Sequence, residues 1–363
     1  MKKICIVVGT RPEIIKMSSI IRVCIKQDVP YFVVHSGQHY SYELDGIFFE
    51  QLNLPKPIYN LHIKSSAPNR QGEHTGKMLI EMEDVFLKEK PDIVLVQGDT
   101  NTVLAGTLCA SKLHIPVGHV EAGLRSYDQI MPEEVNRKIC DHLADYLFVP
   151  TEKEREICLG EKIDSRKIFI TGNTIVDAVL DNVKLSEKEK VLEKLEIETR
   201  NYFVVTTHRP ENVDNKEKLT NIIKLLEKID QKYNIPIVFL VHPRTEKMFS
   251  LYGLKIPQNI KKIDPLGFLE FIHLEKNARL ILTDSGGIQE EACILKVPCV
   301  TLRENTERTE TVDVGANIIA GTDTENVLRC VETMLDVKRE WENPFGNGKA
   351  GETIIKYILK NRN

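Results

Sequence analysis

Residues 4–24 read ICIVVGTRPEIIKMSSIIRVC, and this stretch decides the fold. Ile4–Val8 is a continuous apolar run of the length of a buried strand, and a Gly-Thr pair ends it. Pro12 suits the first turn of a helix and Glu13 suits the positive end of the helix dipole. Apolar residues then recur at helical spacing, at Ile14, Met17, Ile21 and Cys24. A buried strand followed at once by a helix is typical of a parallel sheet.

The same alternation of strand and helix patterns continues along the chain. Strands are expected at Ile4–Val8, Tyr31–Val34, Asp92–Val96, Pro116–Val120, Tyr146–Val149, Tyr202–Thr206, Ile235–Val241, Arg279–Thr283 and Pro298–Leu302. These runs are apolar on both sides, as parallel strands covered by helices on both faces require. The sequence therefore predicts the α/β class, with two doubly wound, Rossmann-like domains.

The opening motif returns in the second half of the chain. Val7–Glu13 (VVGTRPE) resembles Val205–Glu211 (VTTHRPE), and each follows the first expected strand of its half. A match this short can arise by chance. The alternative is two similar halves that offer these loops to a shared cleft, since open α/β sheets bind ligands at their carboxyl ends. We expect one domain at 1–171 and a second at 172–348, and the helical piece 349–363 can complete either of them.

Bulk properties exclude several function classes. The chain has 363 residues, 42% hydrophobic and 28% charged, which is enough for two ordinary cores. The net charge of −4 indicates neither a nucleic-acid surface nor an anionic-membrane surface. The first apolar run is too short for a signal peptide or a membrane span, so we expect a cytoplasmic protein. The eight cysteines form no CxxC pair, which predicts reduced, buried thiols.

The strongest local motif is Asp284–Ala292 (DSGGIQEEA), which follows a strand and opens a helix. Ser285 can cap that helix, and Gly286 and Gly287 let an anion approach its exposed N–H groups. The Glu291 carboxylate can accept hydrogen bonds from both hydroxyls of a ribose. The plainer interpretation is a strand-to-helix turn with glycines for tight packing. The motif is neither GxGxxG nor a Walker A loop, so it indicates neither NAD nor ATP cleavage.

Three acidic residues stand at strand ends or helix starts. Asp99 follows an expected strand, Glu121 comes directly off another, and Glu133 opens a helix. The strand ends of a parallel sheet share one edge, so these carboxylates can converge, raise one another's pKa and transfer protons near neutral pH. Taken singly, Asp99 is also an ordinary cap and Glu133 an ordinary dipole partner, whereas Glu121 is harder to explain in that way.

Cationic residues complete the candidate site. Arg and Lys pair with phosphate oxygens, and a histidine within His-Arg-Pro-Glu at a strand end suits a ligand role. The set is Arg11, Lys16, His208, Arg209 and Arg308. The other histidines make no convincing metal site: His35 and His39, for example, flank a loop and do not share a helix face. We therefore expect no metal and no cofactor.

Together these motifs resemble those of the non-hydrolysing UDP-N-acetylglucosamine 2-epimerases. The matching blocks are Gly9–Glu13, Gly98–Thr100, Gly118–Arg125, Pro132–Glu134, Ile168–Thr174, Asp284–Ala292, Thr306–Arg308 and Asn343–Gly346. The resemblance implies the GT-B fold of nucleotide-sugar glycosyltransferases, with two domains facing a cleft that closes on the substrate. It also implies that the helix at 349–363 packs back on the first domain and that the protein is a homodimer.

The activity that the resemblance implies is the interconversion of UDP-N-acetylglucosamine and UDP-N-acetylmannosamine, through loss of UDP, a 2-acetamidoglucal and re-addition of UDP. The implied substrate contacts are Arg11, Lys16, His208, Phe271, Ser285, Gly286, Gly287, Glu291 and Arg308. The implied catalytic residues, with base and acid left unassigned, are Lys16, Asp99, Glu121, Glu133 and His208. A second, activating substrate site in bacterial members matches Gln38, Arg70, Gln71, Glu134 and Arg209.

Two positions depart from the family pattern, and other functions stay open. Thr309 stands where proline is frequent, and Leu266 stands where a glutamine is common near the uracil. A glycosyltransferase would use the same UDP platform with an acceptor sugar. A hydrolysing epimerase would release free N-acetylmannosamine, and a nucleotide-sugar sensor would bind without turnover.

Overall fold

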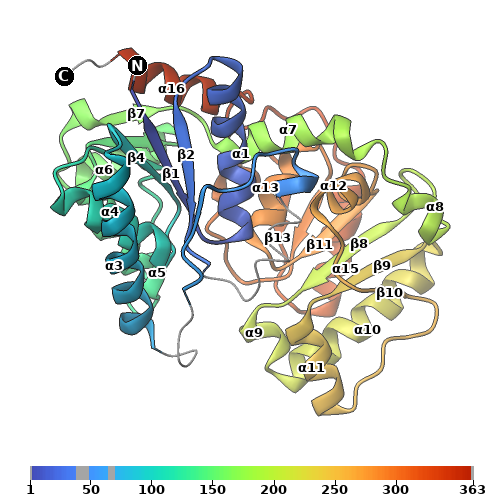
Figure 1. The fold of residues 1–363 in the computed structure, drawn as a ribbon. Coiled ribbons are helices and arrows are strands. Elements are labelled where there is room, and N and C mark those ends of the chain that lie inside the picture. The colour runs from blue at the N-terminus through green and yellow to red at the C-terminus, as the bar shows by residue number, and fades with distance from the viewer. Residues whose placement is uncertain (1, 38–48, 64–69, 361–363) are drawn as a thin grey trace. The chain divides into compact units, whose positions relative to one another are not determined.

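The computed structural model describes residues 2–37, 49–63 and 70–360, which form two compact units (Figure 1). Unit 1 comprises Met1–Leu180 and Phe345–Asn363, and unit 2 comprises Asp181–Pro344. The sequence places a domain boundary at 171, just before helix α7 (Thr174–Ser186), whereas the two units divide within that helix. In the described ranges, no helix has the length and apolar character needed to cross a membrane.

Unit 1 is built on a seven-stranded sheet in the order β3-β2-β1-β4-β5-β6-β7. The strands are β1 (Ile4–Val8), β2 (Tyr31–His35), β3 (Tyr59–Asn60), β4 (Ile93–Gln97), β5 (Val117–Val120), β6 (Tyr146–Val149) and β7 (Ile168–Ile170). Every neighbouring pair is parallel. The strand order reverses between β1 and β4, which is where doubly wound sheets bind ligands at their carboxyl edge.

Helices cover this sheet on both faces. They are α1 (Arg11–Lys26), α3 (Gln71–Glu89), α4 (Asn101–Lys112), α5 (Pro132–Leu143), α6 (Glu152–Gly160) and α16 (Ala350–Lys360), with a short 3₁₀ turn at Ser165–Lys167. Helix α1 starts where the sequence predicts, with Pro12 in its first turn and Thr10 at the N-cap. The Glu13 carboxylate accepts hydrogen bonds from the Gly9 and Thr10 N–H groups, which closes a capping box.

Unit 2 repeats the design with six parallel strands in the order β10-β9-β8-β11-β12-β13. The strands are β8 (Phe203–Thr207), β9 (Ile237–Val241), β10 (Lys261–Ile263), β11 (Leu280–Thr283), β12 (Cys299–Thr301) and β13 (Asn317–Ile319). The helices are α8 (Val191–Leu195), α9 (Pro210–Val213), α10 (Lys216–Tyr233), α11 (Pro243–Tyr252), α12 (Phe268–Lys276), α13 (Gly286–Ile294), α14 (Thr309–Asp313) and α15 (Thr324–Leu335). The predicted class of two doubly wound α/β halves is confirmed.

All eight cysteines are buried and free, as the sequence predicts. Burial raises the pKa of the Cys24, Cys109 and Cys140 thiols to about 12, so these groups stay protonated packing residues at neutral pH.

The C-terminal helix α16 packs on α1 within unit 1. Ile354, Ile355 and Ile358 form its buried face. A Cβ added to Gly351 would lie 3.0 Å from the Ser19 hydroxyl oxygen, so the small residue permits the close approach. The Asp177 carboxylate accepts hydrogen bonds from the Ala350 and Gly351 N–H groups at 3.1 and 2.9 Å, which caps the start of the helix.

We expect Asp177→Ala to lower the free energy of unfolding by about 1–2 kcal/mol, because two amides of α16 lose their buried acceptor. The midpoint of chemical denaturation measures the loss, and hydrogen exchange of the α16 amides should quicken. Glu342→Ala, at an exposed carboxylate that precedes this helix in the chain, serves as the control and should change the stability by less than about 0.5 kcal/mol. Unchanged exchange in α16 would show that the cap does not hold the helix.

Candidate functional site

A buried ion pair stands at the carboxyl edge of the unit 1 sheet. The Lys16 ammonium on α1 lies 2.8 and 2.6 Å from the two carboxylate oxygens of Glu121, at the end of β5. The two side chains are 14% and 3% exposed. Gln97, the last residue of β4, also donates a hydrogen bond to the same carboxylate. The structure thus brings together two residues that the sequence assigned to catalysis, and adds a third that it missed.

The backbone at Glu121 is unusual. Its φ is 64°, in the left-handed region that residues other than glycine rarely adopt. The N–H groups of Glu121 and Ala122 both donate to the Phe148 carbonyl, at 3.0 and 3.2 Å, which turns the chain sharply as it leaves the strand. Backbone strain of this kind persists only where the surrounding structure fixes it, and it gathers at functional sites.

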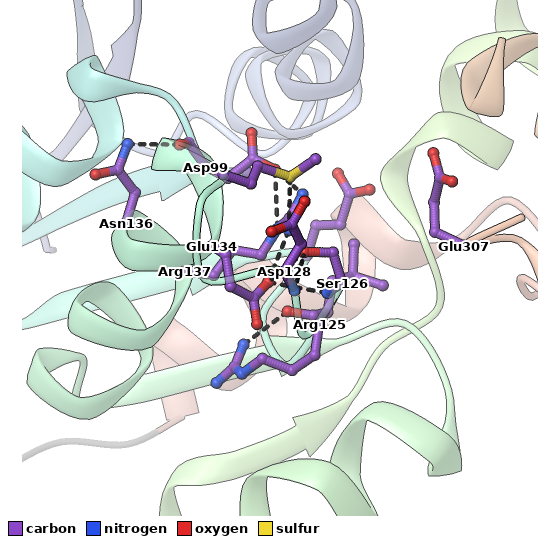
Figure 2. A network of polar contacts seen from close by, with 12 residues as sticks. Asp99, Arg125, Ser126, Asp128, Glu134, Asn136, Arg137 and Glu307 are labelled. Atoms are coloured by element: carbon purple, nitrogen blue, oxygen red, sulfur yellow. Dashed lines mark hydrogen bonds and ion pairs between the residues drawn. The ribbon is translucent and has the colours of Figure 1, made fainter. Parts of the chain in front are cut away.

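A second network holds Asp99 (Figure 2). The Arg137 guanidinium on α5 donates to Asp99 at 2.6 and 3.0 Å and to Glu134 at 2.9 Å. Glu134 is 1% exposed and also accepts hydrogen bonds from the N–H and hydroxyl of Ser126. Burial alone raises the pKa of Glu134, but Ser126 and Arg137 outweigh it and hold that pKa below its ordinary value. Arg137 therefore joins a predicted catalytic acid to a predicted allosteric one.

Glu13 links the loops that follow β1 and β4. Its carboxylate accepts hydrogen bonds from the Gly9 N–H at 2.5 Å, the Thr10 N–H at 3.0 Å and the Thr100 hydroxyl at 2.5 Å. The side chain is buried, and burial raises its pKa to about 7 in spite of these donors. The sequence assigned Glu13 only a helix-dipole role, so this link between the two loops is new.

Among the other unit 1 candidates, Gln71 is linked to Asp99 through Asn101 and Asn136. Arg11 and Glu133 are exposed in the first turns of α1 and α5. In the described residues, the networks engage Glu134 rather than its neighbour Glu133. Arg70 pairs with Glu73 at 2.8 Å, and Gln71 accepts a hydrogen bond from Asn101. Gln38 lies outside the described residues.

In unit 2, Asp284 organises the loop that carries His208 and Arg209. This fully buried carboxylate at the end of β11 accepts hydrogen bonds from the Thr207 hydroxyl at 2.6 Å and from the two loop N–H groups at 3.0 Å. The His208 ring nitrogen Nδ1 lies 3.1 Å from it. Burial alone raises the pKa of Asp284, but His208 and Thr207 outweigh it and lower that pKa.

Helix α13 begins at the glycine pair, as the sequence predicts, but the cap differs. Ser285 occupies the N-cap position, yet its hydroxyl makes no capping hydrogen bond to the helix. The Ser285 N–H instead donates to the Thr283 hydroxyl at 3.0 Å, which turns the chain into the helix. The expected capping role of the Ser285 side chain is therefore wrong, whereas the position of the helix start is right. Gly287, beside Gly286, lies in the first turn.

A carboxylate that the sequence did not single out lies against this helix start. A Cβ added to Gly286 would lie 2.6 Å from a Glu307 oxygen, so the Glu307 side chain would have to shift to make room for it. Arg209 and Arg303 pair with Glu307 at 3.1 and 2.8 Å. Burial opposes ionisation of Glu307, but Arg303 and Arg308 bring its pKa down to about 2. An anion therefore already occupies the positive end of α13, which shows that the place accepts negative charge.

The remaining unit 2 candidates lie on α12, α13 and α14. Arg308 precedes α14 and pairs with buried Glu290 at 2.9 Å. Glu291 is half-buried on α13 and faces Glu275, a fully buried acid of α12. Phe271, which is half-buried, also lies on α12. Burial, and then the Glu291 charge, raise the pKa of Glu275 well above its ordinary value, which favours the protonated form of this acid.

The two departures from the family pattern have modest local consequences. Thr309 is exposed and is the first residue of α14, a position that suits proline as well, so the helix start is kept. Leu266 is half-buried just before Gly267, the N-cap of α12. Across the described residues, no cluster of three or more His, Cys, Asp or Glu side chains is arranged to hold a metal ion.

Comparison with known proteins agrees with this geometry. The family model described as UDP-N-acetylglucosamine 2-epimerase matches residues 23–359. The chain belongs to the UDP-N-acetylglucosamine 2-epimerase family. It is 57% identical to the UDP-N-acetylglucosamine 2-epimerase of Methanocaldococcus jannaschii, in an alignment that covers 98% of each chain.

Solved structures extend the similarity from sequence to fold. The crystal structure of the M. jannaschii UDP-GlcNAc 2-epimerase, in complex with UDP-GlcNAc and UDP, superposes with a TM-score of 0.88 and 56% identity, over 99% of this chain and 100% of that chain. A glycosyltransferase from Rickettsia africae shares the fold alone, with a TM-score of 0.57 and 12% identity over 98% and 93% of the two chains. The GT-B-like fold class predicted from the sequence is confirmed.

Proposed function

We propose that this epimerase interconverts UDP-N-acetylglucosamine and UDP-N-acetylmannosamine by eliminating UDP and adding it back. One observation carries the proposal: Glu121, ion-paired with Lys16, is held in a strained backbone at the carboxyl edge of the sheet, in a chain that is 57% identical to the UDP-N-acetylglucosamine 2-epimerase of M. jannaschii. The relative's structure contains UDP-GlcNAc and UDP, which are a substrate and the leaving group of such a reaction.

The order of bond breaking follows from the substrate. The hydrogen on C2 of the sugar is not acidic until the bond between C1 and the diphosphate oxygen breaks and C1 gains positive character. The departing diphosphate therefore needs stabilisation first. We assign this role to the first turn of α13, with Ser285, Gly286 and Gly287, and to the cations Arg11, His208 and Arg308. One well-placed donor to developing charge typically contributes about 3 kcal/mol at the transition state.

Proton transfer at C2 is assigned to the acids of unit 1. A carboxylate removes the proton to give 2-acetamidoglucal, and a second group protonates the opposite face before UDP returns. Inversion thus needs two proton-handling groups. Glu121 and Asp99 suit these roles, because each is held by a cation at the end of neighbouring strands β5 and β4. Glu133, exposed at the start of α5, is the third candidate. Phe271 and Glu291 are assigned to the uracil and the ribose.

The reaction in D₂O tests the function directly. With UDP-N-acetylglucosamine as the sole sugar, we expect UDP-N-acetylmannosamine to form and deuterium to enter C2 of both UDP-sugars, followed by NMR. Turnover without an acceptor excludes the glycosyltransferase, and intact UDP-sugar products exclude the hydrolysing enzyme. Product that keeps hydrogen at C2 would contradict the proton-transfer scheme, and binding without turnover would favour a sensor.

Glu121→Gln should lower kcat by about 10²–10⁴-fold, because the amide keeps the size of the side chain but accepts no proton. Steady-state kinetics on both UDP-sugars measure the loss. The matched control is Glu156→Gln, at an exposed acid of α6 in the same unit, which should leave kcat unchanged. Near-normal activity of the Glu121 variant would remove this residue from the catalytic set.

We also propose that the protein is a homodimer, as its resemblance to the family implies. Supporting this, α5 carries the apolar side chains Val135, Ile139 and Leu143 at a spacing of four, all exposed in the single chain. Such a row on one helix face is typical of a packing surface. Light scattering of the purified protein should give twice the chain mass, and Ile139→Lys should give the single-chain mass. A monomeric wild type would contradict the proposal.

A further inference from the structure

His119 is a buried histidine of β5 whose two ring nitrogens both face hydrogen-bond acceptors. It is 1% exposed. Its Nδ1 lies 2.7 Å from the Asp141 carboxylate, and its Nε2 lies 2.7 Å from the carbonyl oxygen of Gly98. A neutral imidazole carries one N–H and one bare nitrogen, so it can satisfy only one acceptor.

The protonation state follows from these partners. A carbonyl oxygen only accepts, so Nε2 must carry a hydrogen to bond to Gly98. An ionised carboxylate also only accepts, so Nδ1 must carry one too. The alternative is a neutral ring facing a protonated Asp141. Arg125 argues against it, since its guanidinium lies 2.7 Å from the other Asp141 oxygen, and an adjacent cation favours the carboxylate.

The charged groups around the ring agree with a cationic His119. Burial and the Arg125 charge lower the pKa of His119, whereas Asp141 and the Gly98 carbonyl raise it, and the balance lies above the ordinary value. Arg125 is balanced in turn by Glu161 at 2.6 Å. The cluster therefore holds two cations and two carboxylates, which neutralise one another inside the unit.

Two thiols are further titratable neighbours of this cluster, and the charges of Asp99 and Glu154 act on them in addition to that of Asp141. Cys140 and Cys158 both lie close enough to Asp141 to feel its charge. Burial raises the pKa of each thiol to about 12, so both are neutral at neutral pH. They leave the charge balance of the cluster unchanged.

The cluster holds the backbone immediately before Asp99 and on both sides of Glu121, the two candidate catalytic acids. The Gly98 carbonyl immediately precedes Asp99. The Asp141 carboxylate also accepts a hydrogen bond from the Gly123 N–H at 3.1 Å. His119 and Gly123 thus bracket Glu121, whose left-handed backbone needs outside support.

We propose that His119 works as a buried imidazolium that, with Asp141, positions Asp99 and Glu121 for proton transfer. It is a positioning residue, because it acts through the backbone of these acids. The roles of the two acids rest on the proposed function, whereas the charge state of His119 does not. The hydrogen bonds from protonated His119 to Asp141 and to the Gly98 carbonyl form a clamp that links β4, β5 and α5. Loss of one proton from His119 should therefore loosen both acids together.

NMR of wild-type protein with ¹⁵N-labelled histidine tests the charge state. The spectrum is recorded at pH 7.5, about one unit above the ordinary histidine pKa. His119→Gln identifies the signals of this residue among the ten histidines. We expect both ring nitrogens of His119 to be protonated. A neutral His119 ring at this pH would overturn the proposal, whether or not the chain proves to be an epimerase.

Paired variants test the positioning role. His119→Asn keeps a donor toward Asp141, and His119→Gln keeps one toward Gly98. We expect each variant to lower kcat by about 10–10²-fold with little change in KM, because misplacing a catalytic group costs rate more than binding. His142→Gln, at an exposed histidine of the same helix as Asp141, is the control and should keep full activity. Equal kcat in the wild type and both His119 variants would overturn the positioning role.

The pH profile separates positioning from simple stability. The clamp is complete while His119 is protonated, so kcat should fall as pH rises through the raised pKa of the folded protein. Asp141→Asn removes the anion that raises this pKa, so the alkaline fall should move to lower pH. An unmoved profile in a folded Asp141→Asn variant would contradict the clamp. If wild type shows no epimerase activity, the proposed function fails, and the NMR result alone decides the His119 assignment.

Discussion

The arrangement of unit 1 depends on keeping one ion pair, Lys16 with Glu121, largely out of water. Moving two charges from water into a protein costs several kcal/mol per ion, and only good geometry with further hydrogen bonds recovers that cost. Gln97 supplies one such bond, and the sharp turn after β5 aims the carboxylate toward α1. The cluster around His119 then fixes that turn from both sides. Apolar residues would pack at this place at lower cost, so the benefit of the pair lies in the position of its charges rather than in stability.

The two units use different carboxylates to accept the N–H groups of the loop that follows the first strand. Each repeats the Arg-Pro-Glu motif after its first strand, and in each a carboxylate accepts the N–H groups of that loop. In unit 1 the acceptor is Glu13, from within the motif. In unit 2 the corresponding Glu211 is exposed, and Asp284 from β11 accepts instead. The change leaves the His208 ring beside the Asp284 carboxylate, at the position that Thr10 occupies in unit 1.

The sequence predicted the fold well because central strands of parallel sheets are continuous apolar runs. Short edge strands such as β3, β10 and β13 escaped detection, since they are only partly buried and are defined by pairing with a neighbour. Glu121 and Lys16 were predicted from motifs, but Arg137 and Glu307 were not. Their roles come from contacts with distant parts of the chain, and local pattern carries no sign of such contacts. The positive φ of Glu121 is likewise imposed by its surroundings.

The cation beside Glu121 bears on the chemistry in a definite way. A carboxylate held by an ammonium group is a weaker base than an unpaired one, because the neighbouring charge favours its ionised form. Such a base removes only a hydrogen that is already acidic. In the proposed reaction, C2 becomes acidic only after the diphosphate begins to leave, so a carboxylate paired with Lys16 suits the order in which the leaving group departs first. The same pairing neutralises the charge of Glu121, which suits the approach of the anionic nucleotide sugar in the proposed reaction.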